Sequence, residues 1–187
     1  MNNIPEFGIK RENEERRDGG CAVVFDPVSQ KYAVNRMIDH NRFGFFSGGV
    51  EDGESMEEGI LREVIEESGL YDFLYVEKIG EALCHFYASL KKLNRVAYAT
   101  CLLVILKSTD LKPTKLEEHE RFELAWVTAE EMLLDLNKNN EDKNRDHWIY
   151  FFKKSVNRAI ELGYDTTSQK CSIIKTCHQN NYPKKIH

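Results

Sequence analysis

The segment from Gly48 to Leu70 limits the fold more than any other part of the sequence. Three glycines within its first six residues form a turn-forming run, and a stretch with helical periodicity follows. Ser55 and Glu58 have the spacing of a capping box, and Gly69 stands where a helix commonly ends in the left-handed conformation. These signals predict a tight loop followed by a helix over Met56 to Ser68.

The predicted helix has one apolar face and one charged face. At about 100° per residue, four aliphatic side chains fall within an arc of roughly 140°, and four charged side chains fall within an opposite arc of similar width. The apolar residues are Ile60, Leu61, Val64 and Ile65, and the charged residues are Arg62, Glu63, Glu66 and Glu67. The apolar face is expected in the core, which leaves the charged face for solvent or for a ligand.

The glutamates of the charged face point to a metal site. Glu63, Glu66 and Glu67 are related by i, i+3 and i+4, so their carboxylates converge within one turn and repel one another if unpaired. Magnesium commonly binds between protein carboxylates and substrate phosphates, and Gly59 leaves room for it on the same arc. A solvated helix face, on which Arg62 merely pairs with its neighbours, is the alternative interpretation.

The whole segment resembles the Nudix box. That pattern requires Gly, five residues, Glu, seven residues, Arg-Glu, an aliphatic residue, any residue, Glu-Glu, any residue, Gly and an aliphatic residue. The matching positions are Gly48, Glu54, Arg62, Glu63, Val64, Glu66, Glu67, Gly69 and Leu70. The resemblance implies an α/β fold, a Nudix-type α/β/α sandwich with a mixed β-sheet and a loop–helix–loop catalytic motif.

The resemblance also implies a role for each polar residue of the box. Glu54 and Arg62 would pair and hold the loop against the helix. The expected cofactor is Mg²⁺, with Mn²⁺ as a substitute, bound by carboxylates and one carbonyl. The implied metal ligands are the Gly48 carbonyl, Glu63, Glu66 and Glu67.

Family members often carry a further catalytic or metal-binding glutamate before a strand that contains a tryptophan. Here Glu118 and Glu120 precede Trp126, which makes Glu118 a candidate metal ligand and Glu120 a candidate catalytic residue. The general base that takes a proton from water is one of Glu63, Glu67 and Glu120. An exposed acidic loop is the alternative interpretation of Glu118 and Glu120.

Residues that would bind the substrate are less visible in the sequence. Arg36 and Arg42 precede the catalytic loop and could contact phosphates, and Phe46 could place its ring against a base. Neutral surface positions for the arginines and core packing for the phenylalanine are the alternatives. His147 has no obvious partner, so a structural or solvent role is expected for it.

The remaining pattern predicts one catalytic domain. A lead-in over 1–18 precedes a domain over 19–163 that includes a C-terminal helix, and a polar tail over 164–187 lacks periodicity and could be partly disordered. The expected strands are Gly20 to Phe25, Lys31 to Arg36, Phe43 to Ser47, Phe73 to Ser89, Arg95 to Lys107 and Phe122 to Val127. Two further helices are expected near residues 129–136 and 147–162.

Composition limits the compartment and the partners. The net charge of −5 argues against a basic surface that grips DNA, and no apolar stretch approaches the roughly 20 residues of a membrane-spanning helix. The first residues lack a secretory signal, and the five cysteines imply no disulfide framework. We therefore expect a cytoplasmic monomer or homodimer that interacts with neither DNA nor membrane.

Together these features predict a Mg²⁺-dependent hydrolase that splits a diphosphate linkage in a nucleoside diphosphate derivative. The substrate classes left open are modified nucleoside triphosphates, dinucleoside polyphosphates and nucleotide sugars. The alternatives are a Nudix-like sensor that binds a nucleotide without turnover and a diphosphate isomerase of the same superfamily. RNA decapping is disfavoured because the chain is acidic and lacks a basic patch.

Overall fold

Two adjacent parallel strands that are buried on both faces form the centre of the sheet. They are β3 (Gly19–Asp26) and β8 (Leu93–Leu106). Because side chains alternate along a strand, Val23 packs into one core cluster and Val24 into another on the opposite face. Burial on both faces explains why these strands are nearly continuous apolar runs in the sequence.

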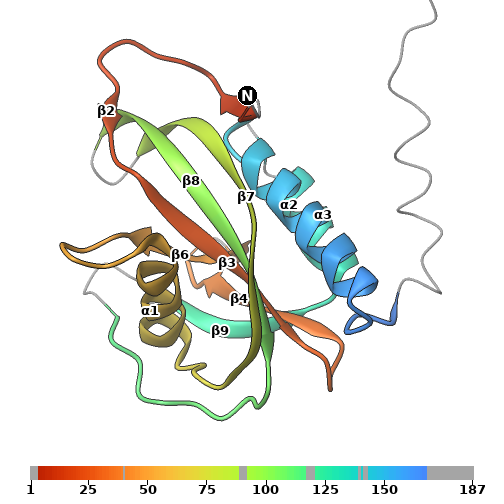
Figure 1. Cartoon of the computed structure of the whole chain (residues 1–187). Coiled ribbons are helices and arrows are strands. Elements are labelled where there is room, and N and C mark those ends of the chain that lie inside the picture. The colour runs from red at the N-terminus through yellow and green to blue at the C-terminus, as the bar shows by residue number, and fades with distance from the viewer. Residues whose placement is uncertain are drawn as a thin grey trace, which may run out of the picture.

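Helices cover both faces of this sheet. The computed structural model describes residues 4–39, 41–88, 92–116, 121–138, 140 and 143–167. Helix α1 (Met56–Ser68) lies on one face, and α2 (Ala129–Lys138) and α3 (Asp146–Glu161) lie on the other (Figure 1). The sheet contains parallel and antiparallel pairs. The predicted fold class, a mixed sheet between helical layers, is confirmed.

Strand pairing brings the glycine loop, the turn-forming run from Gly48 to Gly53, to the centre of the sheet. The strand order is β1-β7-β8-β3-β4-β5, with β2 on β8, β6 on β3 and β9 on β4. The antiparallel pairing of β6 with β3 sets Gly48 opposite Gly20. The remaining strands are β1 (Glu6–Gly8), β2 (Glu15–Arg16), β4 (Lys31–Met37), β5 (Arg42–Gly44), β6 (Phe46–Gly49), β7 (Phe73–Ala88) and β9 (Phe122–Val127).

The segment predicted as a lead-in joins the sheet. Strands β1 and β2 pair in parallel with β7 and β8. The buried ring of His85 fixes this segment, because its Nε2 lies 2.9 Å from Glu6 and its Nδ1 lies 2.8 Å from Glu14. Strand β1 has three residues and β2 has two, so both are too short to show the apolar alternation by which a strand is recognised in sequence.

The predicted C-terminal tail also begins later than expected. Tyr164 packs against the core beneath α3, and the buried Asp165 accepts a hydrogen bond of 2.7 Å from the Tyr32 hydroxyl. Residues 168–187 lie outside the described part of the chain, so the prediction of partial disorder there stays a prediction.

Helix α1 has the boundaries that its sequence predicts. The backbone N–H of Glu58 donates to Ser55 Oγ at 3.2 Å, and the Ser55 N–H donates to Glu58 Oε2 at 2.8 Å, which completes the capping box. Gly69 ends the helix with a φ of 80°. A second capping box precedes α2, since Thr128 and Glu131 exchange the same pair of bonds.

Close packing between α1 and β3 positions the charged face of the helix. Ile60 and Val64 are at most 1% exposed and belong to the core cluster on the α1 side of the sheet. A Cβ atom on Gly20 would overlap the Ile60 side chain and the Thr100 carbonyl. The missing side chain therefore allows the helix to lie directly on β3, with Glu63 beside Gly48 and Glu67 beside Ser47 of β6.

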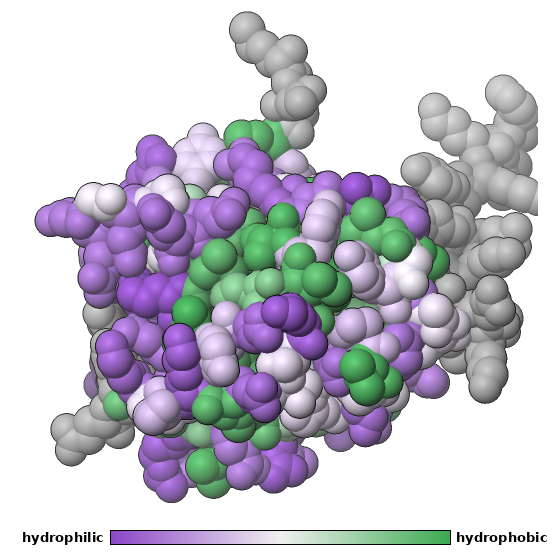
Figure 2. Space-filling view, turned by 60° about the horizontal axis from the view of Figure 1, so that its bottom comes forward, coloured by the Kyte–Doolittle hydropathy of each residue, from purple (hydrophilic) through white to green (hydrophobic). Residues whose placement is uncertain are grey.

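The surface is largely hydrophilic, with an apolar area near the centre of the face shown in Figure 2. The large apolar side chains that remain exposed come from separate elements, among them Val28, Leu74 and Leu134. Within the described residues, no helix is long and apolar enough to cross a membrane.

The two glycines that follow helices provide a stability test. Gly69 and Gly163 have almost the same positive φ, but only at Gly69 would an added Cβ meet a backbone atom, the Lys112 carbonyl oxygen. Gly163→Ala should lower the free energy of unfolding by about 1 kcal/mol through backbone strain. Gly69→Ala should cost roughly 1–2 kcal/mol more. Urea unfolding measures both, and equal losses would contradict the assigned contact with Lys112.

Candidate active site

The loop between β6 and α1 lies directly against the charged face of the helix. A Cβ atom on Gly48 would overlap the carboxyl group of Glu63, so this glycine lets that carboxylate lie against the strand. Gly59 has a similar role in the preceding turn of the helix, where a Cβ atom would lie 3.1 Å from Glu54 Oε2. The two glycines bring loop and helix together where the carboxylates gather.

Arg62 joins the loop to the helix. Its Nε donates to Glu54 Oε1 at 2.8 Å, and one terminal nitrogen donates to the Gly49 carbonyl at 3.1 Å. The other terminal nitrogen donates to Glu63 at 3.0 Å and to Glu66 at 3.1 Å. The predicted pairing of Glu54 with Arg62 is thus confirmed.

These contacts stabilise the charged forms of both partners. The hydrogen bond from Arg62, followed by the backbone bond from Glu51, lowers the pKa of Glu54 below its ordinary value. The hydrogen bonds and charges of the surrounding glutamates, Glu54 first, raise the pKa of Arg62 despite its partial burial. The pair therefore stays ionised throughout the neutral pH range.

The other carboxylates are held by separate donors. Glu67, which is 8% exposed, accepts a hydrogen bond of 3.0 Å from the backbone N–H of Ser47. Glu66 accepts one of 3.2 Å from Lys115 Nζ. Together with Glu63, these side chains line a cavity of about 190 Å³ that Arg17, Gly49, Val50, Glu51, Arg62 and Lys115 complete. We call this cavity the acidic groove.

The donors in the acidic groove are the kind that a hard divalent cation takes. Within the described residues, no three acidic, histidine or cysteine side chains already stand in an arrangement that holds an ion. Glu63 and Glu66 instead share one Arg62 nitrogen. Arg62 also bonds to Glu54 and to the Gly49 carbonyl, so its position does not depend on these two carboxylates alone.

A larger cleft of about 710 Å³ adjoins the acidic groove and shares Arg17 and Gly49 with it. Its floor includes Ala97 and Ala99, whose small side chains leave space above the sheet. The walls come from the ends of β7 and β8 and from the first turns of α3. They carry rings and polar groups, among them Phe86, Tyr87, Arg95, Asn144, His147 and Trp148.

The residues that the sequence suggested for substrate binding lie in different surroundings, and only one of them lines a cavity. Arg42 lines the large cleft. Arg36 is half exposed, pairs with Glu123 of β9 and lines neither cavity. Phe46 is fully buried in the core cluster on the α1 side, where it has no surface for a ligand. Glu118 and Glu120 lie outside the described residues, so their predicted roles stay predictions.

Sequence reasoning missed most of the cleft. Arg17 stood in the assumed lead-in, and Arg95 stood at the start of a long strand segment without any motif. Trp148 lies in the first turn of α3, where its ring packs edge-on against Phe45 at 5.4 Å between centroids. The alternation of Arg95 with Ala97 and Ala99 was a usable signal, because it marks a polar group and two small ones on one strand face.

His147, which was expected to be structural, lies in the cleft wall. Burial, opposed by the negative charge of Asp146, lowers the pKa of His147 to about 4. The ring is therefore neutral at physiological pH and can both donate and accept one hydrogen bond. This is a suitable group for contacting an uncharged part of a ligand.

Comparison with known proteins places the chain in a family. A model of the NUDIX domain matches residues 15–152. The chain belongs to the NUDIX family. Comparison with curated proteins found no match.

Solved structures share the fold at low sequence identity. A MutT protein from Methanosarcina mazei is 18% identical over 79% of this chain and 98% of its own, with a TM-score of 0.55. A NUDIX hydrolase from Listeria monocytogenes is 21% identical over 78% and 94%, with a TM-score of 0.56. The NUDIX domain of Shewanella oneidensis NrtR, solved with ADP ribose, is 14% identical over 79% and 90%, with a TM-score of 0.53.

The lowered pKa of His147 predicts a pH-dependent loss of stability. Between pH 6.5 and 4 the unfolded chain binds a proton at this residue and the folded chain does not, so stability falls as the pH falls through that window. Between pH 7 and 5, the wild type should lose roughly 1–2 kcal/mol more unfolding free energy than His147→Gln. Urea unfolding at both pH values measures this, and parallel losses would refute the lowered pKa of His147.

Proposed function

We propose that this NUDIX protein is a magnesium-dependent hydrolase that splits a diphosphate linkage in a nucleoside diphosphate derivative. The observation that carries the proposal is the junction of two cavities. Glu63, Glu66 and Glu67 line the acidic groove, which shares Arg17 and Gly49 with a cleft large enough for a nucleoside. The ADP ribose bound by the NUDIX domain of NrtR supports this substrate type.

The acidic groove would hold the cation. Glu63, Glu66 and Glu67, with the Gly48 carbonyl, are the proposed ligands, and Glu118 is a further candidate outside the described residues. When bound, Mg²⁺ would supply charge neutralisation for the phosphate oxygens and lower the pKa of an attacking water. The Ser47 N–H donates to one oxygen of Glu67 and so fixes the position of that carboxylate beside β6.

The proposed reaction is attack by water on one phosphorus atom. A P–O bond forms to the water oxygen, the bridging P–O bond breaks, and the departing phosphate takes the electron pair. A glutamate accepts the proton from the water, and Glu63, Glu67 and Glu120 are the candidates. Glu54 and Arg62 act as positioning residues, because their ion pair fixes the loop relative to the helix.

The large cleft would hold the nucleoside side of the substrate. The half-buried rings of Phe86 and Trp148 offer flat apolar surfaces, and His147 and Asn144 supply polar groups beside them. Arg42 reaches the same cleft from β5 and remains a candidate for substrate binding. Modified nucleoside triphosphates, dinucleoside polyphosphates and nucleotide sugars all fit this description.

Turnover is favoured over a purely sensing role. A sensor that binds a nucleotide without hydrolysis has less need of all the acidic residues of the box, and this chain retains every one. The glutamates are also held by movable donors, such as Lys115, rather than by packing alone. This arrangement suits carboxylates that exchange partners when a cation and a phosphate enter.

The proposal predicts separate effects for glutamates on the same helix. Glu66→Gln and Glu67→Gln should each lower kcat/KM on the order of 100-fold, because each removes a negative ligand oxygen from the cation site. Glu57→Gln is the matched control, since Glu57 is exposed on α1 and lines neither cavity. Its activity should stay near that of the wild type.

The assay is hydrolysis of ADP ribose, a nucleoside triphosphate and a dinucleoside polyphosphate, each with Mg²⁺ and with EDTA. At least one substrate should be hydrolysed with Mg²⁺, and EDTA should abolish the reaction. Circular dichroism establishes that the variants fold. Full activity in folded Glu66→Gln and Glu67→Gln would exclude the proposed cation site.

A further inference from the structure

Two arginines from neighbouring strands project into the large cleft from one face of the sheet. In the parallel pairing of β2 with β8, Glu15 lies opposite Arg95 and Arg16 lies opposite Val96. Arg17, the next residue, donates its backbone N–H to the Val96 carbonyl at 3.0 Å and so continues the ladder. Alternation along the strands then places the side chains of Arg17 and Arg95 on the same face.

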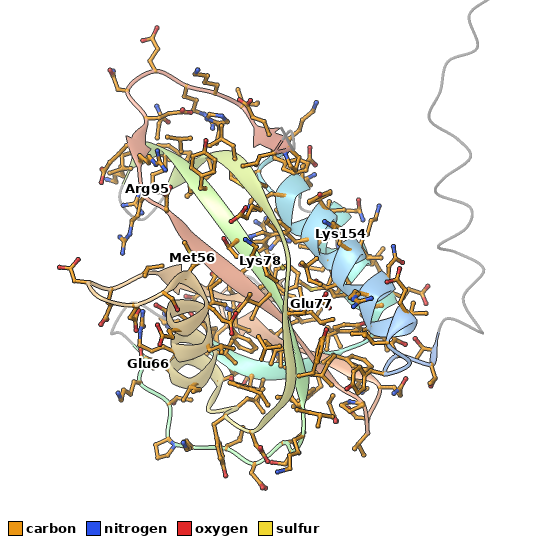
Figure 3. The ribbon with its side chains drawn as sticks, in the orientation of Figure 1. Met56, Glu66, Glu77, Lys78, Arg95 and Lys154 are labelled. Atoms are coloured by element: carbon orange, nitrogen blue, oxygen red, sulfur yellow. The ribbon has the colours of Figure 1, made fainter. Side chains whose placement is uncertain are left out.

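Both side chains line the cleft. Figure 3 shows Arg95 at the end of β8 that lies beside β2. Arg17 also lines the acidic groove, and its guanidinium lies beside Gly49, where a Cβ atom would be 3.3 Å away. Arg17 thus marks the junction between groove and cleft, whereas Arg95 lies within the cleft. We call the two residues the arginine pair.

The arginine pair has no acidic partner within the described part of the chain. Arg95 Nε is buried and lacks a hydrogen-bond acceptor there, and no salt bridge among those residues involves Arg17. Asp18, the acidic residue among those that line the cleft, accepts hydrogen bonds from Arg16 at 2.7 Å and from the Tyr98 N–H at 2.9 Å. A buried N–H without an acceptor is unfavourable, so a ligand that brings an acceptor would be bound there.

A third arginine of the cleft, Arg145, has a structural role and so differs from the arginine pair. Arg145 also lines the cleft, but its guanidinium donates to Asp135 at 2.9 Å and to the Phe43 carbonyl at 2.9 Å. Those bonds hold the start of α3 against β5. Arg17 and Arg95 make no comparable side-chain bonds within the described residues, although both face the same cavity.

We propose that the arginine pair is an anion site that binds the phosphate on the nucleoside side of the scissile bond. This inference rests on the proposed function and narrows its substrate class. The negative charge of the substrate must extend from the acidic groove past Arg17 into the cleft, which fits a nucleotide with a continuous phosphate chain. A substrate with an apolar group next to its diphosphate, such as an isoprenoid, would leave Arg95 without a partner.

The test measures binding without catalysis. Wild-type protein in EDTA at low salt is titrated with ADP and with adenosine, and calorimetry gives both dissociation constants. Removing the cation leaves the acidic groove repulsive, so any preference for ADP comes from cationic side chains. The wild type should bind ADP at least about 10-fold more tightly than adenosine, and the preference should weaken as salt is added.

Variants of the arginine pair test whether these two side chains cause the preference for ADP over adenosine. Arg17→Gln and Arg95→Gln should each weaken ADP binding about 10-fold while leaving adenosine binding unchanged. Arg17→Lys should retain part of the affinity, because it keeps the charge and loses the planar fork. Arg11→Gln is the matched control, since Arg11 lies in the same N-terminal segment and lines neither cavity. It should bind ADP like the wild type.

The two proposals fail in different ways. Equal affinity of the wild type for ADP and adenosine, or unchanged ADP binding in both glutamine variants, would overturn the anion site even if hydrolysis is observed. Absent hydrolysis beside arginine-dependent ADP binding would instead overturn the proposed function and leave the anion site supported. Arg17 is exposed, so Arg17→Gln provides a folded variant even if Arg95→Gln is unstable.

Discussion

The active-site region depends on one guanidinium group that holds mutually repelling carboxylates together. Arg62 bonds to Glu54 and the Gly49 carbonyl on the loop and to Glu63 and Glu66 on the helix. Without this cation, the acidic side chains of α1 would repel one another, and the loop would lose its link to the helix. A single arginine therefore gives the loop and α1 a fixed relative position.

The sheet gives that arrangement a rigid base. β3 and β8 are buried on both faces, so α1 and α3 pack against the same two strands from opposite sides. The glycines of β6, Gly48 and Gly49, lie opposite the first residues of β3. The acidic groove and the large cleft meet there and share Arg17 and Gly49. The proposed sites for the cation and for the nucleoside therefore adjoin one another.

Local signals in the sequence were sufficient to predict helix α1 and its boundaries. The capping box of Ser55 and Glu58, the stop at Gly69 and the apolar arc that includes Ile60 depend on residues within a few turns of one another. Their geometry is fixed by the helical repeat, so the convergence of the glutamates was predictable before any tertiary contact was known. The pairing of Glu54 with Arg62 followed from the family pattern.

The cleft could not be predicted in the same way, because its walls come from distant parts of the chain. Arg17, Arg95 and Trp148 meet only after β2 pairs with β8 and α3 packs on the sheet. Phe46 shows the opposite error, because its ring was suggested for substrate binding and the strand register places it in the core. By itself, the sequence determined the boundaries of α1 and the gathering of its glutamates, because the helical repeat fixes both. Only long-range strand pairing and helix packing decided which side chains line the cleft beside them.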